Sequence, residues 1–161
     1  MAYAVVRTDN LSGIQDGARL VSMRYYVSTT KTAIQNGNVV SIGALDEPGV
    51  YKASAPSAKQ ALGKLALVAN PEIFRDGRTY HSLDEYINEA GKVIRGYILK
   101  SGDVFSVTAE ALDSTPGAST VGLEIQAGTT FKCVTALTDA VAEYLGSDTA
   151  NGYTYYKFRV I

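Results

Sequence analysis

The sequence predicts an all-β fold, a mainly antiparallel sandwich or barrel of about nine or ten short strands. Two observations support this. Short segments alternate apolar and polar residues, which is typical of strands with one buried face, and clusters of Gly, Pro, Asn and Asp separate them at short intervals. A length of 161 residues suits one domain, and no stretch approaches the roughly 18 apolar residues of a membrane span.

The chain divides into two parts. Residues 1–17 hold short apolar pairs among polar residues and glycines, without a lasting period, and predict an extended N-terminal arm. Residues 18–161 predict a single β-rich domain. Its first clear strand covers residues 19–28, where apolar side chains alternate with polar ones. Further strands are predicted at residues 50–53, 64–69, 121–125, 129–135 and 152–161.

Turn signals join these strands. Asn36-Gly37 between apolar runs predicts a tight β-hairpin over residues 33–43, because both residue types tolerate positive φ. Pro48-Gly49 predicts the next turn.

A second hairpin is predicted at residues 95–112, with its turn at Gly102. Its apolar face is core, and Ser106 and Thr108 lie on the solvent-facing side. Residues 139–145 fit either a capped short helix or a strand; we assign a strand because the segments on both sides are strands.

One short helix is predicted near residues 83–90. Ser82 and Glu85 have the spacing of a capping box, and Gly91 follows as a terminator. The helix has one apolar stripe, formed by Leu83, Tyr86, Ile87 and Ala90.

Little in the chain indicates chemistry. Fifteen Lys and Arg nearly balance 16 Asp and Glu, so no strong field attracts nucleic acid or an acidic membrane. The single histidine, His81, precedes the predicted helix and cannot build a multi-histidine metal site, and Cys133 reads as a small buried residue. We therefore expect no enzyme, and assign no catalytic, cofactor-binding or metal-binding residue.

The tyrosines are the least ordinary feature, with 11 Tyr and no Trp. Tyrosine is enriched in protein interfaces because its large ring is apolar and its hydroxyl bonds polar groups, although it is also common on ordinary sheet surfaces. Together with the apolar residues of the arm, the tyrosines supply six candidate interface residues: Tyr3, Val5, Val6, Tyr26, Tyr153 and Tyr155.

The order of several segments resembles the capsid-associated proteins of tailed bacteriophages, specifically head decoration, or cement, proteins. The likeness lies in the sequence patterns of residues 33–40, 64–69, 95–112 and 126–132 and not in one invariant motif. It extends over most of the chain from about Arg19 onward.

The resemblance implies a structural virion protein that binds the outer surface of an assembled capsid in the host cytoplasm and stabilises it. Its implied partners are the major capsid protein and further copies of itself, often as trimers, with no nucleic acid and no membrane. The resemblance carries no catalytic residues or cofactors.

With it comes the hypothesis that residues 2–17 add a strand to a sheet edge of the capsid protein or of a neighbouring copy. A head-fibre or tail protein, or a β-sandwich module that binds glycans or a host surface, are the alternatives.

Overall fold

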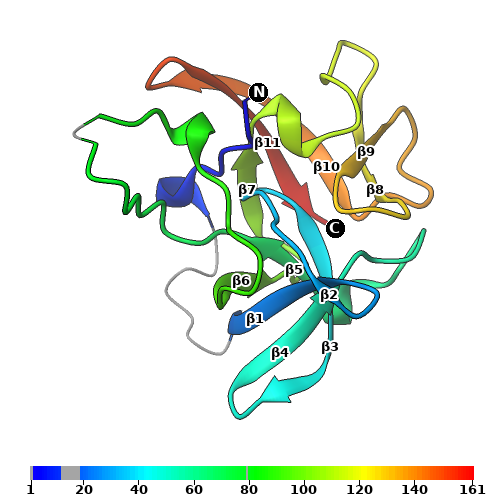
Figure 1. The fold of residues 1–161 in the computed structure, drawn as a ribbon. Helices are drawn as coiled ribbons and strands as arrows, with labels where there is room; N and C mark the ends of the chain where they lie inside the picture. The colour runs from blue at the N-terminus through cyan, green and yellow to red at the C-terminus, as the bar shows by residue number, and fades with distance from the viewer. Residues whose placement is uncertain (1, 12–18, 79) are drawn as a thin grey trace.

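The computed structural model describes residues 2–11, 19–78 and 80–161. These residues form eleven strands in two sheets, joined by loops and short 3-10 turns, so the predicted all-β class is confirmed. In Figure 1 one sheet occupies the lower half of the molecule and the other the upper right.

The first sheet is a small closed barrel with a short hairpin extension. In spatial order its strands are β2 (Thr30–Lys31), β1 (Leu20–Val27), β4 (Val50–Ser54), β3 (Val39–Glu47), β5 (Leu65–Val68) and β6 (Ile94–Ile98). The strand β1 pairs in parallel with β4 and antiparallel with β6, so the row from β1 to β6 closes on itself and β2 extends from β1. Closure removes open edges from the five barrel strands.

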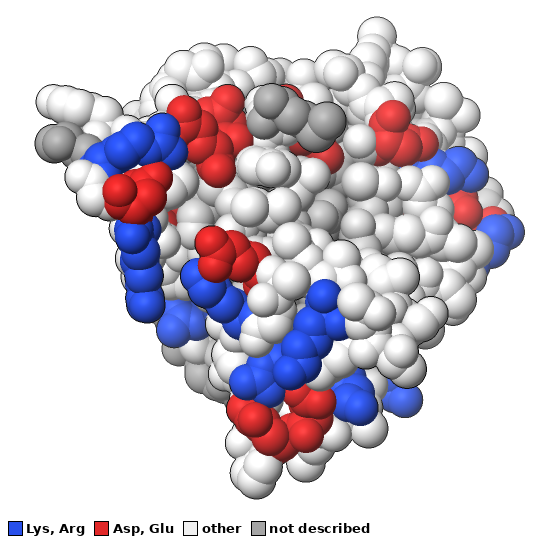
Figure 2. All heavy atoms as spheres, viewed as in Figure 1, with Lys and Arg blue, Asp and Glu red and all other residues white. Residues whose placement is uncertain are grey.

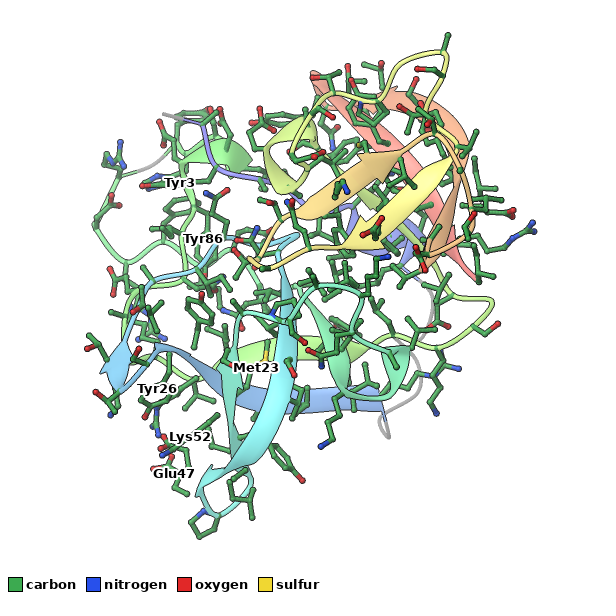
Figure 3. All side chains as sticks on the ribbon, turned by 90° about the vertical axis from the view of Figure 1, so that its right-hand side faces the viewer. Tyr3, Met23, Tyr26, Glu47, Lys52 and Tyr86 are labelled. Atoms are coloured by element: carbon green, nitrogen blue, oxygen red, sulfur yellow. The ribbon has the colours of Figure 1, made fainter. Side chains whose placement is uncertain are left out.

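The barrel interior is apolar and tightly filled. Met23 is fully buried among residues such as Val40 and Val68, and Figure 3 shows it within the barrel. A Cβ atom added at Gly96 would lie 2.6 Å from Met23 Cε. The glycine on β6 therefore leaves space for the methionine on β1.

The second sheet is antiparallel. Its spatial order is β7 (Val104–Val107), β11 (Tyr153–Val160), β10 (Ala142–Ala150), β8 (Gly122–Ile125) and β9 (Phe131–Val134). The hairpin β10–β11 turns at Asn151 and Gly152, which have φ of 53° and 83°. A register irregularity between Tyr144 and Gly146 interrupts its ladder at Leu145.

The two sheets share the main core. All four residues of β5 are buried, because Leu65 and Leu67 pack in the core between the sheets while Ala66 and Val68 fill the barrel. A strand with two buried faces is apolar throughout, and this explains the unbroken apolar run from which residues 64–69 were predicted as a buried strand.

Several other predicted strands are also confirmed. The segments 19–28, 121–125, 129–135 and 152–161 contain β1, β8, β9 and β11, and the segment 50–53 covers all of β4 except its last residue. The turn at Pro48-Gly49 joins β3 to β4, and Gly49 has φ of 79°. The ambiguous segment 139–145 leads into a strand, which begins at Ala142.

The predicted hairpin over residues 95–112 is wrong. Its two strands belong to different sheets, because β6 pairs with β5 and β1 while β7 pairs with β11. The turn is held by Asp103, whose carboxylate accepts from the Lys100 amide at 2.9 Å. The alternation after Val107 does not continue as a strand, since Ala109–Ala111 form a 3-10 turn, η5.

The predicted hairpin over residues 33–43 is also wrong. A turn does occur at Gly37, which has φ of 81°, but Ile34 on its first side pairs with Asn88 through an isolated bridge. On its second side Val39 pairs with Leu67 of β5. The turn signal was correct, and partners distant in sequence took both flanking segments.

The predicted helix is much shorter than residues 83–90. Only one 3-10 turn forms, η4 (Leu83–Glu85), and Ser82 makes no side-chain cap. The Glu85 amide donates to the backbone carbonyl of Ser82 at 3.1 Å. The backbone of Asn88 pairs instead with Ile34, which is incompatible with a helix continuing to residue 90.

The described part of the predicted arm, residues 2–11, is built into the domain. Val6 forms an antiparallel bridge with Val107 on the outer edge of β7, and the Arg7 amide donates to the Ser106 carbonyl at 3.0 Å. The arm ends in a 3-10 turn, η1 (Thr8–Asn10). The arm thus adds an extended segment to the edge of its own sheet; residues 12–17 of the predicted arm lie outside the described residues.

This arm also overturns the prediction that Ser106 and Thr108 face solvent. Both are buried, at 1% and 4% exposure. The Thr108 hydroxyl accepts from the Val5 amide at 3.1 Å, and the Ser106 hydroxyl accepts from the Asn10 side chain at 3.0 Å. Their polarity serves contacts with the arm.

Candidate interaction surface

A concavity of the described surface lies in the long connection between β5 and β6. Among the described residues of the range 69–93, η4 is the only helical or strand element, and residues from both halves of this range line a cleft of about 710 Å³ together with the start of β6. Connections of this length without regular structure are uncommon in compact domains and are usually functional when ordered. In Figure 1 this connection forms the green loops at the upper left.

A network of buried polar side chains forms the floor of the cleft. The Asn70 side chain donates to the Tyr86 hydroxyl at 3.0 Å, and that hydroxyl donates to Asn88 at 3.2 Å. Asn88 then donates to Asn36 Oδ1 and to the Ile34 carbonyl, both at 3.0 Å.

The network also ties the two ends of the connection together. Asn70 Oδ1 accepts from the Arg95 amide at 3.1 Å, and Asn36 Nδ2 donates to the Asn70 carbonyl at 2.9 Å and to Glu72 at 3.0 Å. Asn36 and Asn88 are 1% and 2% exposed. Buried amides in a connected hydrogen-bond network hold their backbone segments in one arrangement.

Aromatic rings form one wall. Phe74 meets Tyr86 edge to face, with ring centroids 5.5 Å apart, and stacks on His81 at 3.8 Å. His81 Nε2 lies 2.9 Å from Asp76, whose carboxylate also accepts from Arg78 at 2.8 Å. The hydrogen bond from Arg78 lowers the pKa of Asp76 to about 2.

The rim is partly apolar and exposed. Ile73 is 63% exposed and Val93 is 43% exposed, and both line the cleft. Exposed apolar side chains that rim a concavity are typical of protein-binding sites. Figure 2 shows positive and negative side chains intermixed on the viewed face, with broad uncharged areas between them.

An ion cluster on the barrel fixes the far end of the connection. Arg24 Nε donates to the Gly91 carbonyl at 3.0 Å, while its other nitrogens pair with Asp46 at 2.9 Å and Glu47 at 3.0 Å. The Tyr26 hydroxyl donates to the same Asp46 carboxylate at 3.0 Å. Figure 3 shows Tyr26, Lys52 and Glu47 gathered at this end of the barrel.

Three of the six candidate interface residues are partly exposed, but they do not form one surface. Tyr26 belongs to the ion cluster just described. Tyr153 donates to Asp84 at 3.0 Å, and the Tyr3 amide donates to the Asp84 carbonyl at 2.8 Å. Tyr3 and Tyr153 therefore meet at η4, beside the arm, where they line a second, smaller hollow.

The other three candidates are interior. Val5, Val6 and Tyr155 are 1%, 4% and 3% exposed. Burial raises the pKa of Tyr155, as expected for a phenol removed from water. In this conformation these side chains stabilise the domain and do not present a surface to a partner.

The residues that line the cleft were not among the sequence-based candidates. Asn70 and Asn88 of the lining, and Asn36 that bonds both from beneath, resemble ordinary turn residues in the sequence, and only the fold brings them together. One signal was available: residues 70–82, before the predicted helix, are rich in charged and aromatic residues yet hold no lasting strand or helix period.

Other kinds of site receive no support from the described residues. None of their His, Cys, Asp and Glu side chains gather in threes to hold a metal ion, and none of their helices has the length and apolarity to cross a membrane. Cys133 is partly buried, and burial raises the pKa of its thiol.

Comparisons of the chain with known protein families, curated protein sequences and solved structures found no significant match.

Proposed function

We propose that this protein is a structural protein that binds the outer surface of an assembled bacteriophage capsid and stabilises the shell, as head decoration proteins do. The resemblance of its sequence supports the class. The cleft between residues 70–78 and 85–95 carries the proposal, because it is a preorganised concavity with exposed apolar side chains on its rim.

A shallow site suffices for this role. Many copies on one regular lattice stabilise it through contacts that are individually modest, so neither a deep pocket nor a high net charge is required. The formal net charge of −1 agrees with binding through shape and local contacts.

The sheet edges also support a role as a discrete unit. The barrel is closed, and the arm covers the outer edge of β7. Covered edges oppose uncontrolled strand pairing between copies. Trimers on the lattice would then form through side-chain surfaces.

The test is sedimentation of the purified protein with empty shells of the capsid protein from the same phage. We expect saturable binding at a fixed ratio of copies to capsid subunits. The double variant Ile73→Asp/Val93→Asp should lose occupancy, and Leu145→Asp should keep it, since Leu145 is similarly exposed on the other sheet. Absence of binding by the unaltered protein would reject the proposal.

Deleting the arm is a poor test, because Val5 and Val6 belong to the interior and their loss would destabilise the domain. Loss of occupancy after deletion would not separate a binding role from a folding role.

A glycan-binding or host-surface module is the second candidate, favoured by Phe74 and Tyr86 in the cleft wall. Binding to a glycan array, blocked by Phe74→Ala, would favour it. A head-fibre or tail role would be recognised by electron cryo-microscopy, which would place the bound copies away from the shell surface.

A further inference from the structure

We propose that the cleft binds an extended acidic segment of the partner protein. Carboxylates of that segment would pair with Arg75 and Arg95, and its apolar side chains would pack on Ile73 and Val93. The inference rests on the proposed function, in which that partner is the capsid protein, and it names the chemistry of the contact.

The charges of the cleft favour an acidic partner. Four of its lining residues are basic, and two of these are already neutralised: Arg78 pairs with Asp76 at 2.8 Å, and Lys92 pairs with Glu89. Arg75 and Arg95 are exposed and form no ion pair with any residue of the described ranges. Two free guanidinium groups in one cleft offer bidentate sites for carboxylates.

The apolar rim requires more than charge from the partner. Ile73 and Val93 stand 63% and 43% exposed beside these cations, and Pro71 and Phe74 continue the apolar lining. A segment that mixes carboxylates with aliphatic side chains would satisfy both features, whereas a purely acidic segment would leave the apolar rim in water.

The floor of the cleft contributes shape more than hydrogen bonds. Asn70, Tyr86 and Asn88 bond one another and the backbone, as described above, and the Arg95 amide is already bonded to Asn70. Recognition of a neutral polar ligand such as a glycan would need free donors and acceptors there. Because the floor is held before binding, little ordering cost opposes a partner.

The acidic residues of the cleft argue against nucleic acid as the occupant. Asp76, Glu85 and Glu89 line the same cleft as the two free arginines. A continuous phosphate backbone would meet these carboxylates, whereas a peptide with spaced acidic residues avoids them.

The test uses two fluorescein-labelled peptides. In the Glu peptide, Glu alternates with Val and Leu; in the Gln peptide, Gln takes the place of each Glu. Fluorescence anisotropy should detect binding of the Glu peptide and weaker binding of the Gln peptide. The variant Arg75→Glu/Arg95→Glu should weaken binding of the Glu peptide about tenfold or more. The control Lys64→Glu, an exposed lysine away from the cleft, should leave it unchanged.

Salt provides an independent readout. Raising the salt concentration from about 0.1 M to about 1 M shortens the Debye length from about 10 Å to about 3 Å. This should weaken binding of the Glu peptide more than binding of the Gln peptide. Equal binding of the two peptides, or equal loss in Lys64→Glu, would overturn the inference.

The same variants on empty shells separate the two proposals. If the unaltered protein does not bind shells, the proposed function fails. If it binds and Arg75→Glu/Arg95→Glu binds equally well, the decoration role stands and the acidic-segment inference fails. If Arg75→Glu/Arg95→Glu loses shell binding while the unaltered protein and Lys64→Glu keep it, both proposals are supported.

Discussion

Two buried regions of the molecule have opposite character. The barrel is filled by apolar side chains around Met23, whereas the base of the cleft is built from buried amides around Asn88. Met23 and Asn88 are both nearly inaccessible, at 0% and 2% exposure. The first region stabilises through removal of apolar surface from water, and the second through hydrogen bonds whose partners must all be present.

This difference separates two tasks. An apolar interior tolerates other side chains of similar volume, because dispersion and burial have little directionality. An amide network is directional, so it defines one path for residues 69–93 and thereby the shape of the cleft. We expect the barrel to determine whether the chain folds and the amide network to determine whether the cleft keeps its form.

The largest effect is expected for Met23→Ala. Removing this side chain leaves a cavity in the barrel and should lower the free energy of unfolding by about 3 kcal/mol, measured by urea denaturation. The control Met23→Leu retains most of the volume and should cost less than about 1.5 kcal/mol. Equal losses in the two variants would show that packing volume is not what Met23 supplies.

A somewhat smaller loss is expected for Asn88→Leu, about 2 kcal/mol, although leucine is similar in size. It leaves Asn36 Oδ1, the Ile34 carbonyl and the Tyr86 hydroxyl without their Asn88 partner. Hydrogen exchange should show faster amide exchange in residues 69–93, with the barrel strands unchanged. If Asn88→Leu lowered the free energy of unfolding no more than Met23→Leu does, the contrast between the two buried regions would fail.

Gly96→Ala tests the fit inside the barrel and should cost about 1 kcal/mol. The new Cβ would lie 2.6 Å from Met23 Cε, and the flexible end of the methionine would have to move. Because the two residues touch, the loss in Met23→Ala/Gly96→Ala should be less than the sum of the single losses. Strict additivity would argue against this contact.

The smallest effect concerns pH. The hydrogen bond from Arg24 lowers the pKa of Asp46 from its ordinary value of 3.8. A carboxylate with a lowered pKa in the folded state stabilises the protein above its unfolded pKa, and this contribution is lost as pH falls through the folded value. The thermal midpoint should therefore fall on acidification from about pH 6 to about pH 3, less steeply in Asp46→Asn.

The neutral amide network supplies the control for this measurement. Asn88→Leu should be less stable than the unaltered protein at every pH. Its thermal midpoint should fall with pH at the same rate, because amides do not titrate. Asp9 and Asp148, whose pKa values are also lowered, lie outside residues 69–93 and contribute equally to all these proteins. Equal slopes in Asp46→Asn and the unaltered protein would remove Asp46 from this role.

Local patterns predicted strands well and their partners poorly. Residues 64–69 were identified as a buried strand because an apolar run reports burial of both faces. The Gly37 turn was also identified, yet Ile34 pairs with Asn88 and Val39 with Leu67. A turn signal depends on backbone freedom at two residues, whereas strand pairing depends on which distant segments reach the same edge.

The candidate site was the least predictable part. Tyr155 was proposed as an interface residue from its type, but it lies 3% exposed beneath the arm, where Arg7 is 6.0 Å from its ring. The amides of the cleft floor come from positions 36, 70 and 88, which have no common spacing. Residue type indicated which kinds of group each side chain could bond, and the fold decided which particular residues became its partners.

The sequence alone therefore determined the all-β class, the position of most strands and turns, and the near balance of charge. These depend on alternation, on local backbone preference and on composition, which are properties of neighbouring residues. Only the tertiary structure decided that the first sheet closes into a barrel, that the arm covers β7, and that a cleft beside β6 holds Arg75 and Arg95, which have no ion pair among the described residues. Those features come from contacts between segments far apart in the chain, which local patterns do not encode.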